Sequence, residues 1–403
     1  MRTGVIEGEI SVAPARPDFS LVRGGPLYRL ACRLGLVRAP LALMGTGVVL
    51  AVVTWVPLLI LSALQGLALG GGATVPFFAS VSTHVRFLVA IPLFFAAEAW
   101  IDPRLQNFVH QVIESRLVLP EELPALGAAV RTVSCLRDSI VAEAILLALV
   151  GAFALAGVRV DLSGDISSWR VAGSGVGGRL TPAGWWYAVV ALPVFQFLLC
   201  RWCWRIVMWW AFLWRLSRLN LQLVPIHPDL AGGLGFLGVA QGHFSALSFA
   251  ATSVLAGMFA EQMLFAGASL ASLRLSVLGI VLINLALFVG PLLLFGPSLF
   301  AVKRRGLREY GVLAAGYTRD FDVKWVRGGG PSDEPILGSA DIQSLADLAN
   351  SFEIIRKMRV VPFGLLLVAS IVAATLAPML PLLLLAFPVD ELVRRAVKLL
   401  LGL

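Results

Sequence analysis

The feature of this sequence that most limits its fold is the recurrence of apolar runs about 20 residues long. A helix of that length crosses the roughly 30 Å of hydrocarbon in a bilayer. Hydrophobic residues make up 58% of the 403-residue chain and charged residues 14%, which is far outside the composition of soluble domains. The runs predict seven membrane spans, at about 41–65, 83–101, 139–157, 185–205, 240–264, 276–301 and 362–386. Because helices satisfy their own backbone hydrogen bonds in lipid, the predicted fold class is an all-α polytopic membrane protein.

The basic residues predict the orientation of these spans. With the N-terminus inside and Arg201 and Arg205 left out of the count, 22 Lys and Arg residues fall in the inner segments and 8 in the outer segments. The positive-inside rule therefore favours a cytoplasmic N-terminus. Seven spans place the C-terminus outside, but Pro378 and Pro381 leave open a re-entrant last segment with the C-terminus inside. This topology accounts for the net charge of +8 without a nucleic-acid partner.

Charge and turn residues divide the chain into four predicted parts. The N-terminal part ends in an amphipathic helix, residues 20–38, that is expected to lie on anionic headgroups. The cytoplasmic tail and interfacial helix are predicted at 1–38. Spans one to six are predicted at 39–301, with a cytoplasmic helical hairpin at 103–138 and an outer loop at 158–182 that forms at most a small hairpin. A cytoplasmic helical segment is predicted at 302–361, and span seven with a terminal amphipathic helix is predicted at 362–403.

The stretch CRWCWRIVMWW places Arg201 and Arg205 inside a long apolar run. A tryptophan pair at 185–186 begins this span, and Trp202 and Trp204 follow about 24–29 Å further along a helix. That separation is close to the thickness of the hydrocarbon layer. The tryptophans therefore indicate two interfacial belts, with both arginines extending to the inner headgroups.

A second interpretation pairs these arginines with acidic residues. Glu98 lies at the inner end of span two and Glu143 lies one turn into span three, at about the depth of Arg201. A charge in lipid costs about 2.5–3.5 kcal/mol on insertion scales, so such groups usually pair or line a wet path. We therefore predict a charged inner network of Glu98, Glu143, Arg201 and Arg205, which serves either structural pairing or conduction.

The fourth span stays apolar beyond the membrane, through residues 206–219. Met208, Phe212 and Arg215 fall on one helical stripe that requires cover. We therefore predict a small cytoplasmic helical collar, formed within one chain or shared between subunits. A further helix predicted at 338–359 is expected to dock on this collar or on a partner subunit.

The loop LVPIHPDLAGGLGFLG, residues 223–238, joins spans four and five. Backbone amides near His227, Asp229, Gly232 and Gly233 are candidates to bind an anion or a lipid phosphate. The alternative is a tight turn with close helix packing, in which Asp229 caps the following turn.

Spans six and seven contain prolines that predict interrupted helices. Pro291 and Pro297 lie in span six, and Pro378 and Pro381 lie in span seven. Interrupted helices recur in transporters, where they line cavities, although prolines also occur in other membrane helices. Asn284 in span six is a candidate pore residue or a hydrogen-bonding contact between helices.

The sequence offers no pattern for a metal site, a cofactor or a catalytic centre. The four histidines lack the HxxxH or HxxE spacing of metal ligands. His243 and Glu261 lie 18 residues apart in span five, near opposite faces of the bilayer. We expect His243 to be a hydrogen-bonded interface residue. The pair Cys200 and Cys203 lacks the context of a redox motif, and no nucleophile lies beside a base.

Two segments carry a resemblance to known proteins. IHPDLAGGLGFLG and ILGSADIQSLADLANSFE resemble segments of a group of uncharacterised bacterial multi-pass inner-membrane proteins that carry both. The resemblance covers residues 221–355, and Leu230 stands where that group is expected to have Arg. It implies a bacterial inner-membrane location and supplies no catalytic residues or cofactor.

Two classes of function follow. The first is an oligomeric channel or transporter for ions or small solutes, with a charged mouth on the cytoplasmic side. The alternative is a non-transporting membrane scaffold, sensor or complex subunit whose cytoplasmic helices bind a partner. The expected partners are the lipid bilayer, anionic lipids and further copies of this chain.

Overall fold

The computed structural model describes residues 19–26, 29, 40–70, 72–163, 167–173, 178–329, 335–336 and 339–387. Helices form almost all of the regular structure in these ranges. Six are long and apolar enough to cross a membrane, Met44–Leu64, Val81–Glu114, Ile140–Leu162, Pro182–Leu216, Phe236–Phe265 and Leu270–Val326. The predicted seventh span contains a shorter apolar helix, Leu365–Met379. The predicted all-α polytopic membrane fold is therefore confirmed.

Several spans are compound helices. Their elements are α2 (Pro40–Leu64), α3 (Val81–His84), η2 (Val85–Ala90), α4 (Ile91–Glu114), α6 (Ile140–Ser163), α7 (Pro182–Trp186), η5 (Tyr187–Ala191), α8 (Leu192–Leu216), α9 (Phe236–Gly242), α10 (Ser245–Phe265), α11 (Leu270–Val289), η6 (Gly290–Phe295) and α12 (Gly296–Phe321). The other elements are η1 (Phe77–Ala79), η3 (Pro120–Glu122), α5 (Leu123–Arg137), β1 (Val171–Ala172), β2 (Arg179–Leu180), η7 (Asp322–Val326), α13 (Ala340–Lys357), α14 (Leu365–Leu376), η8 (Ala377–Met379) and α15 (Leu382–Ala386). The antiparallel pair β1–β2 is the small hairpin predicted in the outer loop.

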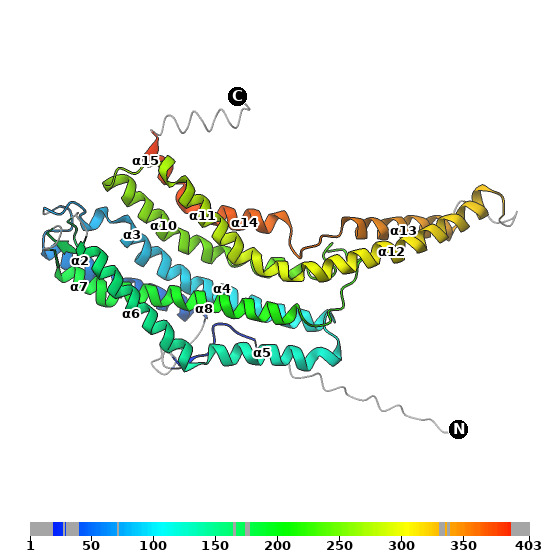
Figure 1. Cartoon of the computed structure of the whole chain (residues 1–403), viewed down its shortest axis with the longest axis horizontal. Coiled ribbons are helices and arrows are strands. Elements are labelled where there is room, and N and C mark those ends of the chain that lie inside the picture. Colours follow the sequence, from blue (N-terminus) through cyan, green and yellow to red (C-terminus); the bar gives the residue numbers. More distant parts are fainter. Residues whose placement is uncertain are drawn as a thin grey trace, which may run out of the picture.

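The spans lie side by side along the long dimension of the molecule (Figure 1). The hairpin of α12 and α13 projects beyond the bundle at one end, which we call the hairpin end. The helix α5 packs on α8 toward the same end. The beginnings of α3 and α7 lie at the opposite end, which we call the loop end.

Three predicted spans continue as helix beyond their expected limits. The helix α4 runs through Pro103, α8 runs to Leu216 and α12 runs to Phe321. Packing explains the extension of α8, because α5 contacts it and Met208 and Phe212 are buried. The cover that the apolar end of α8 requires is therefore provided within one chain.

The N-terminal segment differs from the surface helix predicted at 20–38. Residues 19–25 are bends and irregular backbone rather than helix. Phe19 packs against Trp209 and Phe212, with ring centroids 6.1 and 4.7 Å away. Burial between helices removes the Phe19 side chain from water and headgroups more completely than a surface position would. Most of the remaining predicted helix lies outside the described residues.

The helix α13 packs on α12 rather than on the collar of α5 and α8, and its docking on a partner subunit stays a prediction. Phe352 lies 3.8 Å from the position of a Cβ on Gly311, and Ile355 lies 3.2 Å from that of Gly306. Gly306 therefore lets α13 approach α12 closely, whereas the contact at Gly311 is of ordinary van der Waals length. The predicted boundary at 301–302 falls inside α12, so the hairpin continues a membrane span.

The helix interruptions predicted from proline are present in both spans. The 3-10 segment η6 contains Pro291. The 3-10 segment η8 contains Pro378, and Pro381 precedes the short α15. Proline lacks an N–H and clashes with the preceding turn, which explains these breaks. The predicted terminal amphipathic helix lies outside the described residues.

Gly257 allows α10 to approach α3, and its replacement should separate them. A Cβ on Gly257 would lie 2.9 Å from the Cα of Ser82, so Gly257→Ala should lower the free energy of unfolding by about 1–3 kcal/mol. Thermal unfolding in detergent micelles measures this loss. Gly279→Ala on α11 is the control, because nothing lies within 4 Å of the added Cβ. Equal losses from both variants would contradict a close-contact role for Gly257.

Candidate functional site

Side chains alternate in polarity along one seam, the contact between α3–η2–α4 and α7–η5–α8. From the loop end, the paired side chains are Arg86 with Tyr187, Phe94 with Phe195, and Glu98 with Arg205. The helical rise separates Arg86 from Glu98 by about 18 Å. The seam therefore has a charged layer toward each end and an aromatic layer between them.

Glu98 and Arg205 form a buried ion pair. Arg205 Nη1 lies 2.5 Å from Glu98 Oε1, and the two side chains are 2% and 5% exposed for Arg205 and Glu98. The guanidinium lies 4.9 Å from the ring centre of Trp202. Arg205 and Trp202 are both buried inside the bundle, which corrects the interpretation that this arginine extends out of the protein to the headgroups. Burial is tolerated because each charge neutralises the other.

Asp102 adds a second carboxylate one turn along α4 and binds the N-terminal segment. Its Oδ1 accepts hydrogen bonds from Ser20 Oγ at 2.7 Å and from Leu21 N at 3.1 Å. Arg23 Nε lies 3.5 Å from its other oxygen. Asp102 is not among the residues predicted from the sequence. The available signal is its position four residues after Glu98, on the same helix face.

Glu143 and Arg201 line a small cavity beside this ion pair. Arg137 and Arg205 also line it, and its volume is about 20 Å³, which is room for about one water molecule. The structure therefore brings the four predicted charged residues into one region. Glu98 and Arg205 touch directly, while Glu143 and Arg201 form part of the cavity wall.

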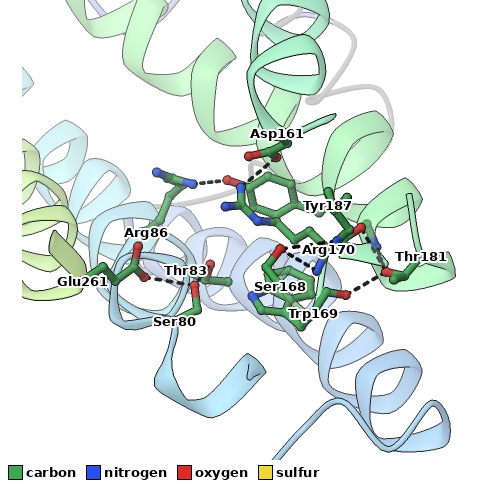
Figure 2. Close-up of polar contacts among 12 residues, drawn as sticks. Ser80, Thr83, Arg86, Asp161, Ser168, Trp169, Arg170, Thr181, Tyr187 and Glu261 are labelled. Atoms are coloured by element: carbon green, nitrogen blue, oxygen red, sulfur yellow. Dashed lines mark hydrogen bonds and ion pairs between the residues drawn. The ribbon is translucent and has the colours of Figure 1, made fainter. Parts of the chain in front are cut away.

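A larger polar pocket of about 460 Å³ lies at the loop end. Figure 2 shows its polar side chains converging from several elements. Its ionisable residues are Arg86 from η2, Asp161 from α6, Arg170 from the loop before β1, Tyr187 from η5 and Glu261 from α10. None of these is among the site residues predicted from the sequence, which places Glu261 near the outer face and assigns it no role.

Arg170 is paired within this pocket. Its Nη1 lies 2.9 Å from Asp161 Oδ2, and its guanidinium lies 4.9 Å from the ring centre of Tyr187. Burial opposes the charge on Arg170, but Tyr187, Asp161 and Glu261 outweigh burial and raise the pKa of Arg170. Arg170 and Asp161 therefore neutralise each other as a charged pair.

The start of α7 fixes the loop that carries Arg170. Thr181 Oγ1 donates a hydrogen bond to Trp169 O at 2.7 Å and accepts one from Gly184 N at 2.9 Å, which caps the helix. Gly184 lies directly on the Arg170 carbonyl, where a Cβ would clash. The backbone on both sides of Arg170 is therefore held by α7.

Glu261 is held by the loop before α3. Its Oε1 accepts hydrogen bonds from Ser80 Oγ at 3.0 Å and from Ser82 N at 2.8 Å. Gly257 lies one turn earlier on the same face of α10 and contacts Ser82. The close approach of these helices is what brings Glu261 within hydrogen-bonding distance.

Both seam helices widen where they contribute to the loop-end pocket. Arg86 lies in η2 and Tyr187 begins η5, and both segments are π-helical, a form that is frequent at functional sites. Pro92 follows Arg86 by six residues, and Pro193 follows Tyr187 by six. Proline cannot donate to the carbonyl four residues earlier, which leaves the preceding turn free to widen. This repeated spacing is a sequence signal for the pocket.

Asp229 occupies the centre of the loop between α8 and α9. Its Oδ1 accepts hydrogen bonds from Ala231 N at 2.8 Å and Gly233 N at 3.2 Å, and its Oδ2 accepts one from Gly235 N at 2.7 Å. His227 Nδ1 lies 2.8 Å from Oδ1. An external anion would have to displace the Asp229 carboxylate from these amides.

The same loop packs on the base of the α12–α13 hairpin. Gly232 has φ +65°, and a Cβ there would lie 3.1 Å from Met358. Arg359 donates to Asp229 O at 2.8 Å through its side chain and to Leu230 O at 2.7 Å through its backbone. The loop therefore makes the close packing of the alternative interpretation, and the anion or lipid contact remains a prediction.

Asn284 lies in a buried polar contact between three helices. Its Oδ1 accepts a hydrogen bond from Ser248 Oγ at 2.8 Å, and that hydroxyl lies 2.9 Å from Thr375 Oγ1. All three residues are buried, so Asn284 links α10, α11 and α14. Pro291 and Pro297 stand at the starts of η6 and α12 and shape the same compound helix.

His243 accepts a hydrogen bond from Trp100 at 3.4 Å, as expected for an interface histidine. Among the described residues, no group of three or more His, Cys, Asp and Glu side chains is placed to hold a metal ion. The candidate sites of this protein are therefore its two charged regions on the seam.

Removing one partner of the buried ion pair should destabilise the protein strongly. Arg205→Met or Glu98→Gln alone should lower the free energy of unfolding by about 3–5 kcal/mol, because the other charge is left buried and unpaired. The double variant should recover most of this loss, since neither position of the pair then carries a charge without its partner. Thermal and denaturant unfolding in micelles measure the free energy of unfolding of the two single variants and the double variant. Strictly additive losses of this free energy would contradict the direct pairing.

Asp229 should make the stability of the protein depend on pH. Burial raises its pKa, but hydrogen bonds from the amides of Ala231, Gly235 and Gly233 outweigh burial and lower the pKa overall. The stabilisation is therefore complete above the ordinary carboxyl pKa of about 3.9 and is lost as pH falls through the lowered pKa. Asp229→Asn should have a lower free energy of unfolding than the unmodified protein at pH 6. Its free energy of unfolding should also change less between about pH 5 and pH 2. Parallel pH profiles of the two proteins would contradict this role.

Comparisons with protein-family models, with curated proteins and with solved structures found no match to this chain. The resemblance to bacterial inner-membrane proteins therefore stays a prediction.

Proposed function

We propose that the protein is a membrane transporter of ions or small solutes that exposes the two charged ends of the seam alternately. The observation that carries this proposal is the layering of the seam, which has a polar pocket, an aromatic layer and a buried ion pair in sequence. Ionisable groups in membrane spans usually pair or line a wet path. A pocket of about 460 Å³ at the loop end and a cavity of about 20 Å³ toward the hairpin end suit a conformation open only at the loop end.

In this proposal the hairpin end faces the cytoplasm of a bacterial inner membrane. The helix α12 carries the basic residues Lys303, Arg304, Arg305 and Arg308, and such residues favour the cytoplasmic side. The same residues are the proposed contact with anionic lipids. The charged cytoplasmic mouth is then the region around Glu98, which is closed in this conformation.

Opening the hairpin end requires two contacts of the seam to separate. Arg205 must leave Glu98, and Phe195 must move away from Phe94. A buried charge that loses its partner is costly, so water or a charged solute must replace the ion pair as it opens. This coupling gives the ion pair the role of a gate that opens only when its charges are compensated.

Flux across liposomes tests the proposal. The purified protein should carry at least one class of ion or small polar solute above the rate of empty liposomes. The double variant Glu98→Gln with Arg205→Met should lose this flux. Without the two charges, water or a charged solute no longer stabilises the open form of the gate. Arg218→Gln is the control, since Arg218 is exposed on the turn after α8, and it should keep the flux. Unchanged flux in the folded double variant would contradict the gate.

A second candidate function is a membrane scaffold, sensor or complex subunit, and the projecting hairpin favours it. Val312 and Leu313 on α12 are 71% and 56% exposed, as apolar side chains are at many protein interfaces. A partner protein or a second copy of this chain would cover them. Analytical ultracentrifugation of the protein in micelles distinguishes a second copy of this chain from a different partner protein. Leu313→Glu should dissociate a homo-oligomer and leave a monomer unchanged.

A further inference from the structure

The charges of the loop-end pocket divide into a closed pair and an open pair. Arg170 and Asp161 lie 2.9 Å apart and satisfy each other. Arg86 and Glu261 line the same pocket, and no ion pair joins them within the described part of the chain. Figure 2 shows Glu261 beside Arg86, with the Arg86 guanidinium directed toward Tyr187. Glu261 also interacts at longer range with Arg170, but Arg86 and Glu261 each lack a direct ion-pair partner among the described residues.

Arg86 has donor capacity that the protein does not use. Its Nη1 donates to the hydroxyl of Tyr187, and its guanidinium lies 5.4 Å from the ring centre of Phe195. Its buried Nε has no hydrogen-bond partner in the part of the chain described. A guanidinium presents a fork of N–H groups that matches a carboxylate. An anionic group is therefore the natural complement of Arg86.

Glu261 has acceptor capacity that the protein does not use. Both of its hydrogen bonds, from Ser80 and Ser82, end on Oε1. Its Oε2 accepts no hydrogen bond from the residues described. An ammonium group is a suitable donor to this second oxygen. The pocket thus offers a carboxylate site at Arg86 and an ammonium site at Glu261.

The rest of the lining sets the character of the ligand between these two sites. Val160, Met258 and Phe265 contribute apolar wall to the pocket. The four charges of Arg86, Arg170, Asp161 and Glu261 sum to zero, so a ligand without net charge leaves the pocket neutral. A free anion or cation would instead add an uncompensated charge to a membrane-level pocket, which is costly.

We propose that the loop-end pocket binds a small zwitterion, an α-amino acid with an apolar side chain. Arg86 binds its carboxylate, Glu261 binds its ammonium group, and the wall of Val160, Met258 and Phe265 contacts the side chain. The identification of this ligand as the transported solute rests on the proposed function, whereas its binding to the pocket does not.

Equilibrium binding to the full-length protein in lipid nanodiscs tests the site, with three probes of one shape. Leucine carries both charged groups, 4-methylpentanoate lacks the ammonium group, and 3-methylbutylamine lacks the carboxylate. Leucine should bind at least about tenfold more tightly than either analogue, because each lost charged hydrogen bond has that effect on affinity. Equal affinity for leucine and 4-methylpentanoate, or no binding of leucine, would overturn the proposal.

Variants assign the two charged contacts. Arg86→Gln should weaken leucine binding at least about tenfold and leave 3-methylbutylamine binding unchanged, and Glu261→Gln should weaken leucine and leave 4-methylpentanoate unchanged. Arg179→Gln is the control, because Arg179 is exposed on β2 outside the pocket lining. Arg86→Lys, which keeps the charge, should fold and bind leucine more tightly than Arg86→Gln. Equal leucine affinity in Arg86→Gln and Arg179→Gln would overturn the assignment.

Binding and flux separate this inference from the proposed function. Leucine binding without flux of any solute overturns the transport proposal and supports the zwitterion site. Flux of another solute without leucine binding supports transport and overturns the zwitterion site.

Discussion

The buried ion pair between Glu98 and Arg205 is the interaction on which the arrangement of this bundle depends. Two opposite charges inside an apolar protein must lie together, because either one alone would be left without solvent or a partner. Their contact fixes how far α4 is shifted along α8. With that register set, Phe94 meets Phe195 on the same faces, and Arg86 meets Tyr187 further along.

The two ends of the seam then differ because different elements close them. At the hairpin end, residues 19–25 and α5 fill the space around the charged side chains, and Asp102 takes hydrogen bonds from that segment. At the loop end, the π-helical turns η2 and η5 widen the helices before Pro92 and Pro193. Charged side chains are therefore packed closely at one end and surround open volume at the other.

Asp229 in the α8–α9 loop and Glu261 in α10 show which parts of the two sites are local to the sequence and which are not. The sequence predicts that Asp229 can cap a turn, and its carboxylate does so with three backbone amides. The availability of those amides for an external anion depended on where the carboxylate pointed, which spacing along the chain cannot specify. The sequence predicts that Glu261 lies near one face of the bilayer, but its partners Ser80 and Ser82 lie 181 and 179 residues away in the chain.

The sequence by itself determined the helical membrane class, the approximate positions of the spans and the prolines that interrupt them. These properties are local, because hydropathy is summed over a window of residues and proline acts on its own helical turn. Only the tertiary structure decided that Glu98 pairs with Arg205, 107 residues away, that residues 19–25 enter the bundle, and that Arg86, Arg170 and Glu261 share a pocket. Such contacts depend on the packing of helices distant in the chain, and the same apolar pattern is compatible with many packings.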